Sequence, residues 1–302
     1  QAMVKILSPI CETFFSDYSY GFRPNRSCEQ AINKLLEYIN DGYEWIVDID
    51  LEKFFDNVPQ DKLMSYVHII INDGDTESLI RKYLKAGIMI NGKYEKSEKG
   101  TPQGGNLSPL LSNIILNELD KELESRGLHF TRYADDCVIA VKSRASANRV
   151  MHTITKWIEH KLGLKVNATK THITRPNKLK YLGFGFYYDT KIRNIVQDHT
   201  QVPYNDLRRK HETANNQKEH NALNERIRQL NQVIRGWINY YSICNMKTHM
   251  TRIDEHLRTR LRVIIWKQWK VPASDSGDYK NLGLEKIEQD RHRIWETIIN
   301  GS

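Results

Sequence analysis

The chain has 302 residues, of which 39% are apolar and 27% are charged, a composition typical of a folded globular protein. Its longest apolar runs are about five residues, too short for a membrane-spanning helix of about 20, so we expect no membrane contact. The formal net charge of +8 favours an acidic partner such as nucleic acid.

The four cysteines are far apart in the sequence and include no CxxC pair, which argues against a zinc ribbon or a thioredoxin-like site. They are Cys11, Cys28, Cys137 and Cys244. This usage fits a reducing compartment, so we expect a cytoplasmic protein.

A helix is predicted to begin at Ser27, which forms a capping box with Gln30, and to end at Gly42. Apolar residues recur at helical spacing between these positions. Residues 43–51 then alternate between apolar and polar side chains, as in a strand.

From residue 59 to residue 200 the pattern alternates between helices and short strands, and Asn91-Gly92 is a strong hairpin signal. In chain order we expect helices at 59–72 and 76–86, a hairpin with arms at 88–90 and 94, a Gly- and Pro-rich loop at 100–109, a helix at 109–125, a hairpin at 129–141, a helix at 145–162, and short strands at 164–200, including 181–188. The first 200 residues are therefore predicted to be an α+β domain.

From Pro203 the pattern changes to long helices. The expected helices are 203–218, 221–242 and 247–270. We therefore predict two domains, residues 1–200 and an all-α domain of residues 201–302. Residues 201–270 hold 14 Lys and Arg against 6 Asp and Glu. This local excess suggests a polyanion partner, and a solvated helical face rich in cations explains it equally well.

Three carboxylates lie at the ends of apolar strands. Asp50 ends the strand at 43–51, and Asp135 and Asp136 lie at the tip of the second hairpin. Grouped carboxylates repel one another unless a divalent cation offsets their charge, and oxygen ligands without a His or Cys cluster favour Mg²⁺. Taken singly, each is better explained as a turn or strand-end residue. Asp48 is a further candidate, because alternation places it on the same face as Asp50.

Tyr133-Ala134-Asp135-Asp136, read with Asp50 and Phe54-Phe55-Asp56, resembles the palm of a reverse transcriptase. Further segments that resemble this family, in its order, are Tyr20–Ser27 (fingers to palm), Gly100–Pro109 (nucleotide pocket), Gly163–Thr171 (a lysine-bearing segment) and Leu179–Gly185 (primer grip). Those that resemble the maturase region of group II intron proteins are Leu230-Asn231, Arg235–Trp237, Asn239–Tyr241 and Trp266–Lys270. The resemblance spans about residues 1–270 and is to group II intron-encoded reverse transcriptases.

The resemblance implies a right-hand polymerase. Its palm, an antiparallel sheet with packed helices and partial fingers, would occupy residues 1–200, and an all-α thumb and maturase bundle would follow. Two Mg²⁺ ions, for which Mn²⁺ can substitute, are implied as cofactors. Their implied ligands are Asp50, Asp135, Asp136 and, through its carbonyl, Leu51. Lys170 would protonate or neutralise the departing pyrophosphate, or it is a plain surface lysine.

The resemblance also implies a nucleotide pocket. Its residues would be Arg23, Phe54, Phe55, Gln103 and Gly104. The two phenylalanines would lie beside the incoming sugar and exclude a 2′-hydroxyl, although without Asp50 nearby they would be better explained as core residues. Gly104 and Gly105 would let the backbone approach the nucleotide, because they lack a Cβ. Arg23 and Arg26 would contact phosphates, or they are ordinary loop cations.

Nucleic-acid contacts are expected from cations that lie among aromatic residues, mainly in the C-terminal domain. They are Arg26, Arg235, Arg258, Arg260, Arg262, Lys267 and Lys270. Cations neutralise phosphates and aromatic rings stack on unpaired bases. The helical spacing of Ile227, Leu230 and Trp237 is better explained by the core of a bundle. The arginines at 258–262 are two residues apart, so they fan around the helix and cannot all face one duplex.

We therefore predict an RNA-directed DNA polymerase that copies intron RNA after priming on the 3′-hydroxyl of target DNA, and that assists splicing. The expected partners are intron RNA as template, a DNA or RNA primer, dNTPs and target DNA, with a homodimer as a further option. Two alternatives remain: an RNA-binding splicing cofactor without catalysis, and a domesticated retron or defence reverse transcriptase. The maturase-like segments argue against the second.

The position of the motifs within the chain leads to two further expectations. The sequence begins inside the second motif block of the family, and no CxxC or HNH-like cluster follows residue 270. We therefore expect an N-terminally truncated member, without an endonuclease domain, that associates with nucleic acid in the bacterial cytoplasm.

Overall fold

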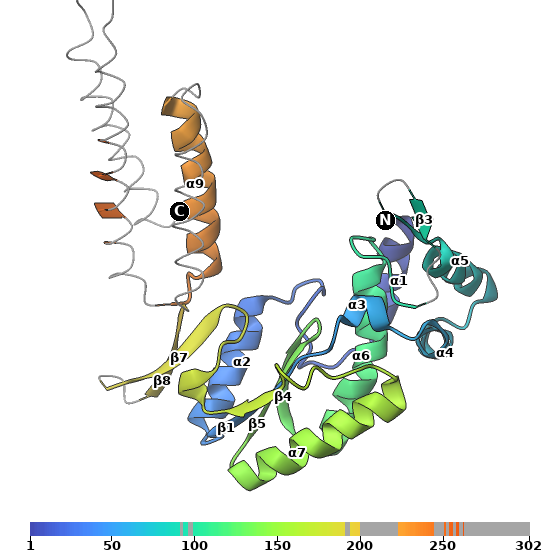
Figure 1. Ribbon diagram of the computed structural model, residues 1–302, viewed down its shortest axis with the longest axis horizontal. Helices are drawn as coiled ribbons and strands as arrows, with labels where there is room; N and C mark the ends of the chain where they lie inside the picture. The colour runs from blue at the N-terminus through green and yellow to red at the C-terminus, as the bar shows by residue number, and fades with distance from the viewer. Residues whose placement is uncertain are drawn as a thin grey trace, which may run out of the picture. The chain divides into compact units, whose positions relative to one another are not determined.

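The computed structural model describes residues 1–90, 93–95, 99–190, 194–199 and 223–244, together with 251, 254–255, 258–259 and 262. The chain divides into two compact units, Gln1–Thr200 and Gln201–Ser302. Figure 1 shows their helices and strands. No helix among these described residues is long and apolar enough to cross a membrane.

A four-stranded antiparallel sheet forms the centre of the first unit. Its strands are β1 (Trp45–Ile49), β4 (His129–Tyr133), β5 (Asp136–Val141) and β6 (His172–Thr174), in the order β4-β5-β1-β6. The hairpin predicted at 129–141 is confirmed as β4 and β5. Ile46 and Val47 point to opposite faces of β1, and both are fully buried. The sheet is therefore covered on both sides.

Helices pack against this sheet (Figure 1). α2 (Cys28–Asn40) contacts β4 and β5, and α7 (Arg144–Trp157) contacts β1, β5 and β6. The predicted capping box at the start of α2 is present, with both reciprocal bonds between Ser27 and Gln30. The helix predicted at 145–162 begins as α7 and ends in a π-helical turn, η1 (Ile158–Leu162).

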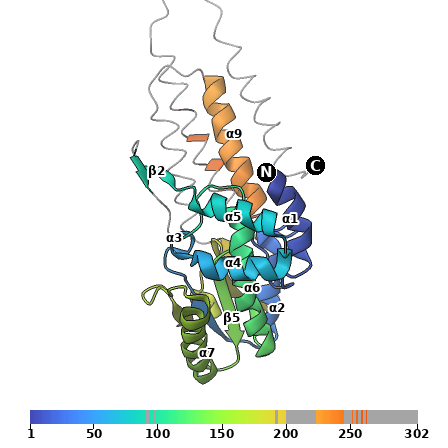
Figure 2. The same ribbon diagram turned by 90° about the vertical axis from the view of Figure 1, so that its right-hand side faces the viewer.

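Further helices pack beside the sheet. They are α1 (Ala2–Glu12), α4 (Gln60–Ile71), α5 (Gly74–Lys85) and α6 (Ser108–Ser125). α6 is buried along most of its length, because α1, α4 and β4 all contact it; Figure 2 shows α1 and α4 beside it. The predictions of α4, α5 and α6 are confirmed to within two residues. α1 and the short α3 (Phe54–Asn57) were not predicted.

Two small hairpins complete the first unit. They are β2 (Ile88–Ile90) with β3 (Lys93–Glu95), and β7 (Phe184–Asp189) with β8 (Asn194–His199). The strand predicted from Tyr181 begins only at Phe184, because Tyr181 forms an isolated bridge to Phe184 after a one-turn 3-10 helix, η2 (Pro176–Lys178).

The second unit contains α9 (Leu223–Tyr240), which agrees with the helix predicted at 221–242. The helix predicted at 203–218 lies outside the described residues. In the third predicted helix, the described residues 251, 254–255, 258–259 and 262 are helical. The helices described in the second unit therefore agree with the prediction.

Candidate active site

Asp50 directly follows β1 and is tied to a loop more than 100 residues later. Its backbone N–H donates to Oγ1 of Thr171 over 3.1 Å, and its carbonyl accepts from the N–H of Asn167 over 2.8 Å. The carboxylate is half-buried, and its Oδ2 lies 3.4 Å from Nζ of Lys170. The structure therefore brings together two of the predicted site residues, Asp50 and Lys170.

Asp135 and Asp136 lie at the turn of the β4–β5 hairpin. Tyr133 pairs with Asp136, so Ala134 and Asp135 form a two-residue turn. β1 pairs with β5 so that Ile49 faces Cys137, and Asp50 therefore follows beside Asp136. This strand pairing places the three predicted carboxylates at one end of the sheet.

The pKa of Asp136 shows that these carboxylates interact. Asp136 is exposed to solvent, but nearby protein atoms displace enough water to raise its pKa to about 6. The negative charges of Asp135, Asp48 and Asp50 raise the pKa further, whereas Lys170 lowers it. The carboxylates around Asp136 thus carry an excess of negative charge, which Lys170 opposes.

Asp48 lies near the same carboxylates, because its side chain is on the same face of β1 as that of Asp50. Burial raises the pKa of Asp48 to about 6; His172 on the adjacent strand lowers it and Asp50 raises it. Nδ1 of His172 lies 4.0 Å from Oδ2 of Asp48. Strand alternation had already made Asp48 a candidate, and the structure places it as a fourth, more deeply set carboxylate.

The chemistry of these side chains fits a hard divalent cation. Within the described ranges, no three His, Cys, Asp or Glu side chains form a ready-made metal-binding group. The donors are nevertheless all carboxylate oxygens, and the loss of surrounding water, followed by their mutual repulsion, raises the pKa of Asp136. A cation such as Mg²⁺ would relieve that repulsion. Asp50, Asp135 and Asp136 are the residues that would hold it.

A pocket of about 810 Å³ opens beside Asp50 and Asp135. Its lining residues are Asp50, Leu51, Glu52, Lys53, Phe54, Phe55, Gln103, Asp135 and residues 165–170. The two phenylalanines differ in exposure. Phe54 is 3% exposed and belongs to the main core, whereas Phe55 is partly exposed. Phe55 is therefore the ring that is free to meet a ligand in this pocket, and Phe54 supports it edge-on, with 5.3 Å between ring centroids.

The Gly- and Pro-rich loop reaches the pocket through Gln103. Nε2 of Gln103 donates to Oδ1 of Asp56 over 2.7 Å, and the N–H of Thr101 donates to the carbonyl of Phe55 over 2.7 Å. These bonds tie the loop to the segment that follows Asp50. Asp56 thus holds Gln103, a role that the sequence analysis did not assign.

The two adjacent glycines of this loop have different surroundings. Gly104 has a left-handed backbone, with φ of +76° and open space around it. At Gly105, a Cβ would lie 1.9 Å from the hydroxyl oxygen of Tyr83. At Gly105 it is therefore the Tyr83 side chain that approaches the backbone closely. The missing Cβ leaves room for this ring to pack against the loop.

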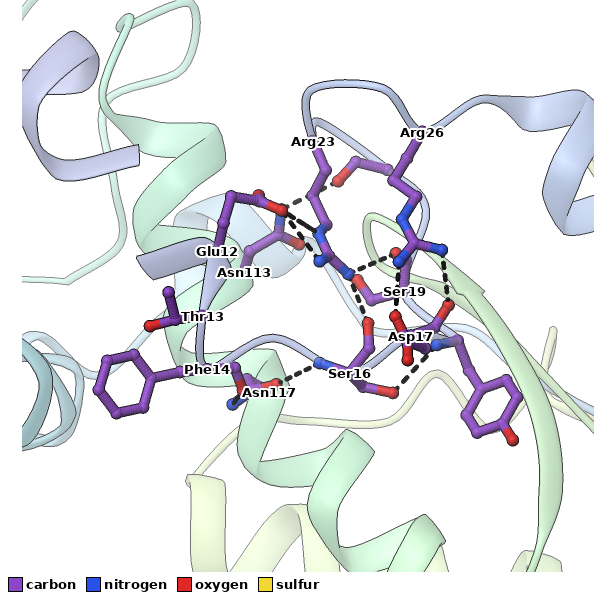
Figure 3. A network of polar contacts seen from close by, with 12 residues as sticks. Glu12, Thr13, Phe14, Ser16, Asp17, Ser19, Arg23, Arg26, Asn113 and Asn117 are labelled. Carbon is purple, nitrogen blue, oxygen red and sulfur yellow. Dashed lines mark hydrogen bonds and ion pairs between the residues drawn. The ribbon is translucent and has the colours of Figure 1, made fainter. Parts of the chain in front are cut away.

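The structure does not place Arg23 or Arg26 at the pocket. Arg23 is buried, and Figure 3 shows its guanidinium between Glu12, the Ser19 carbonyl and the Ser16 carbonyl. Nη2 lies 2.9 Å from Oε2 of Glu12. This corrects the expectation that Arg23 meets a nucleotide, because its donors are used inside the fold. Arg26 pairs with the exposed Asp17 over 2.6 Å.

The predicted C-terminal contacts are only partly described. Arg235, Arg258 and Arg262 are exposed, and Nη2 of Arg258 lies 2.5 Å from Oδ2 of Asp254. The predicted residues outside the described part of the chain are Arg260, Lys267 and Lys270. Trp237 packs against Tyr241 with 5.1 Å between their ring centroids. These rings therefore contact one another on one end of α9, in keeping with a bundle core.

Two protein families match this chain. The reverse transcriptase (RNA-dependent DNA polymerase) family matches residues 1–186, and the group II intron maturase-specific domain matches residues 205–281. Group II intron-encoded protein LtrA of Lactococcus lactis subsp. cremoris is 39% identical, over 64% of this chain and 42% of LtrA. Protein YkfC of Escherichia coli is 33% identical, over 59% of this chain and 56% of YkfC. The chain thus spans about half the length of these curated relatives.

Solved telomerase structures share the fold. The apo telomerase of Candida tropicalis has a TM-score of 0.55 at 13% identity, over 87% of this chain and 54% of that chain. A form of it truncated from the C-terminal domain has a TM-score of 0.52 at 15% identity, over 65% of this chain and 45% of that chain. These likenesses confirm the predicted palm-like α+β fold. The chain therefore belongs to the reverse transcriptase family, and its residues 205–281 match the group II intron maturase-specific domain.

Proposed function

We propose that this chain is part of an RNA-directed DNA polymerase encoded by a group II intron, and that it adds dNTPs to the 3′-hydroxyl of a primer paired with intron RNA. The observation that carries the proposal is the pairing of β1 with β5, which places Asp50 beside Asp136 at a pocket lined by Asp135, Phe55 and Gln103.

The carboxylates of Asp50, Asp135 and Asp136 would hold two Mg²⁺ ions, with the Leu51 carbonyl as a further oxygen. When bound, such ions lower the pKa of an attacking hydroxyl and neutralise the leaving oxygen. The protein's part is to keep the acidic side chains oriented and to hold them on the rigid end of a sheet. Lys170, whose Nζ lies 3.4 Å from Asp50, would donate a proton of its own ammonium group to the departing pyrophosphate or would neutralise its charge.

Two side chains would select and orient the nucleotide. The Phe55 ring lies at the pocket with Phe54 packed behind it, so it would contact the sugar and leave no room for a 2′-hydroxyl. Gln103, held by Asp56, would present its amide to the incoming nucleotide. Both roles need a side chain that is fixed by its neighbours before the ligand arrives.

Primer extension tests the proposal. The 302-residue chain is given an RNA template with an annealed DNA primer, dNTPs and Mg²⁺, and Asp135→Asn is compared with Asp61→Asn, an exposed acid of α4. We expect extension by the wild type and by Asp61→Asn, and none by Asp135→Asn, with RNA binding equal in all three. Extension by Asp135→Asn at the wild-type rate would contradict the site. RNA binding without extension by the wild type would leave this chain as a splicing cofactor.

Binding of intron RNA is a second function, supported by the maturase-specific match at residues 205–281. Arg235 and Arg262 are exposed on helical segments, whereas Arg258 is partly neutralised by Asp254. Neutralising Arg235 is therefore expected to weaken RNA binding and to lower the slope of log affinity against log salt by about 0.7 for each lost phosphate contact on a single strand. An unchanged slope would place the RNA elsewhere on the protein.

A further inference from the structure

Arg132 is a fully buried cation on β4, two residues before the turn that carries Asp135. All five of its N–H donors are used. Nε donates to Oδ1 of Asp120 over 2.7 Å, Nη1 to Oδ1 of Asn113 over 3.1 Å and to the carbonyl of Ala134 over 2.8 Å, and Nη2 to Oγ of Ser19 over 2.7 Å and to Oδ2 of Asp120 over 2.5 Å. A lysine has three donors around a point charge and cannot reproduce this arrangement.

The ion pair of Arg132 with Asp120 is unusual because both side chains are 0% exposed. Burying such a pair costs desolvation on both sides, so well-packed apolar residues of similar volume often stabilise a fold as well or better. Stability alone is therefore a weak explanation for a guanidinium at this place. Its geometry suggests what else it does.

One bond of Arg132 reaches the turn itself. Ala134 has φ of +58°, a left-handed conformation that is strained for a residue with a Cβ and that hairpin turns usually give to glycine. The Ala134 carbonyl accepts from Nη1 of Arg132. Because the peptide unit is planar, holding this carbonyl also sets the plane of the bond that leads into Asp135. Arg132 thus fixes the direction in which Asp135 leaves the turn.

Gly21 holds the same turn from another side. A Cβ on Gly21 would lie 2.2 Å from the backbone nitrogen of Ala134. The Gly21 carbonyl accepts from Nδ2 of Asn113 over 2.9 Å, and Oδ1 of Asn113 is in turn bonded to Arg132. The turn is therefore enclosed between Gly21 and the guanidinium, and Asn113 links the two.

The backbone of Arg132 closes this enclosure. Its N–H donates to the Tyr18 carbonyl over 2.9 Å, and its carbonyl accepts from the N–H of Tyr20 over 2.8 Å. Residues 18–21 therefore run beside β4 up to the turn. A segment more than 100 residues away in sequence and a buried ion pair together determine the position of the turn.

We infer that Arg132 is a positioning residue for Asp135 and Asp136. It holds the strained Ala134 turn, together with Gly21, so that both carboxylates keep the orientation needed to bind a divalent cation. That the carboxylates bind a cation rests on the proposed function. That Arg132 and Gly21 hold their turn rests on the contacts described above. The proposed function names the three carboxylates, whereas this inference assigns the orientation of their turn to a buried arginine that does not itself bind the cation.

Arg132→Lys is the first test, with Arg126→Lys as its control. Arg126 is an exposed arginine of the same unit that pairs with Glu122. Amide hydrogen exchange of residues 133–137, followed by mass spectrometry, reports the turn without any metal or substrate. We expect exchange there to be about tenfold or more faster in Arg132→Lys, since a buried charge-assisted bond is lost, and unchanged in Arg126→Lys.

Cation binding and turnover give a second readout. The affinity for Mn²⁺ is measured by electron paramagnetic resonance of the free ion, and kcat and KM by primer extension. Changes in the residues that support metal ligands typically cost about 10–100-fold in affinity or activity. We expect Arg132→Lys to lose Mn²⁺ affinity and kcat in that range, with the KM for primer–template unchanged, because the nucleic-acid surface is untouched.

Gly21→Ala tests the inference without changing the ion pair between Arg132 and Asp120. It replaces Arg132→Lys as the test variant if that protein does not fold. Its control is Gly74→Ala on α5, where a Cβ meets no atom within 4 Å. Circular dichroism and thermal unfolding establish that each variant is folded at the assay temperature. Gly21→Ala is expected to speed exchange at residues 133–137 and to weaken Mn²⁺ binding, whereas Gly74→Ala should do neither.

The outcomes separate the two proposals. Wild-type exchange at residues 133–137 in folded Arg132→Lys or in folded Gly21→Ala overturns the positioning role. A wild-type chain that neither extends primers nor binds Mn²⁺ overturns the proposed function, and the exchange measurement then still decides whether Arg132 holds the turn. Faster exchange together with weaker Mn²⁺ binding in both variants, but in neither control, supports both proposals.

Discussion

Nζ of Lys170 lies 3.4 Å from Oδ2 of Asp50, although 120 residues separate the two in the sequence. The contact exists because the loop at 165–171 is bonded to the backbone at the end of β1, through Asn167 and Thr171. Lys170, for which the sequence allows both a surface role and a catalytic one, therefore lies beside a candidate metal ligand.

Lys170→Ala is expected to slow nucleotide addition by about 10²–10⁴-fold, the usual contribution of a positioned general acid. Lys170 is 68% exposed, so its ion pair contributes at most about 1 kcal/mol to stability. Single-turnover incorporation and thermal unfolding measure the two effects. Lys121→Ala, which removes an exposed lysine paired with Glu118, is the control. Equal incorporation rates in both variants would remove Lys170 from the mechanism.

Phe55→Ala is expected to let ribonucleotides enter, because the partly exposed ring is removed from the pocket. Phe54→Ala is expected to destabilise the fold by about 3–5 kcal/mol instead, since Phe54 is 3% exposed in the core. The ratio of rNTP to dNTP incorporation and urea unfolding distinguish the two. If Phe55→Ala keeps the wild-type ratio, the ring does not select the sugar.

Asp56→Ala is expected to raise the KM for dNTPs with little change in kcat, because Gln103 loses the carboxylate that holds its amide 2.7 Å away. The effect should disappear in a Gln103→Ala background, where there is no amide left to hold. A double-mutant cycle on the KM for dNTPs measures this coupling. Additive effects of the two substitutions would show that Asp56 acts independently of Gln103.

Arg23→Gln is expected to destabilise the protein by about 3–5 kcal/mol, because it leaves Glu12 without its buried partner. Arg26→Gln removes a pair whose acid, Asp17, is exposed, so a change below about 1 kcal/mol is expected. Urea unfolding compares them. A selective rise in the KM for dNTPs in Arg23→Gln, without loss of stability, would restore Arg23 to the nucleotide pocket.

Burial raises the pKa of the Cys11 thiol from its usual 9.0 to about 11. Between pH 9 and 11 the unfolded chain loses this proton while the folded chain keeps it. The free energy of unfolding therefore falls as pH rises, by up to about 1.4 kcal/mol per pH unit. Below pH 9 the contribution of the protonated thiol to stability is fully present. Urea unfolding at pH 8, 9 and 10 should show a shallower decline in Cys11→Ala. Part of the decline in stability should remain in Cys11→Ala, because burial also raises the pKa of Cys137. Identical slopes would contradict this role of Cys11.

Local patterns were sufficient to predict most of the helices and strands that the structure describes. The capping box of Ser27 and Gln30, the hairpin at 129–141 and the helical spacing of α4, α5 and α6 are set by interactions between residues close in sequence, and each was confirmed. α1 and α3 were missed. α1 contains Pro9, and α3 follows Lys53, which has φ of +44°, so both lack the usual signals of a helix.

The sequence by itself indicated which carboxylates are candidates for the site, the order of the motifs and the α+β organisation of residues 1–200. Only the tertiary structure decided which cations meet those carboxylates. Lys170 forms an ion pair with Asp50, whereas the guanidinium of Arg23 is bonded to Glu12 and to two backbone carbonyls. Arg132 donates to the Ala134 carbonyl from the buried side of the turn. The physical reason is that a cation's role depends on which acceptors surround it after folding, and strand pairing and burial bring those acceptors from segments about 100 residues apart.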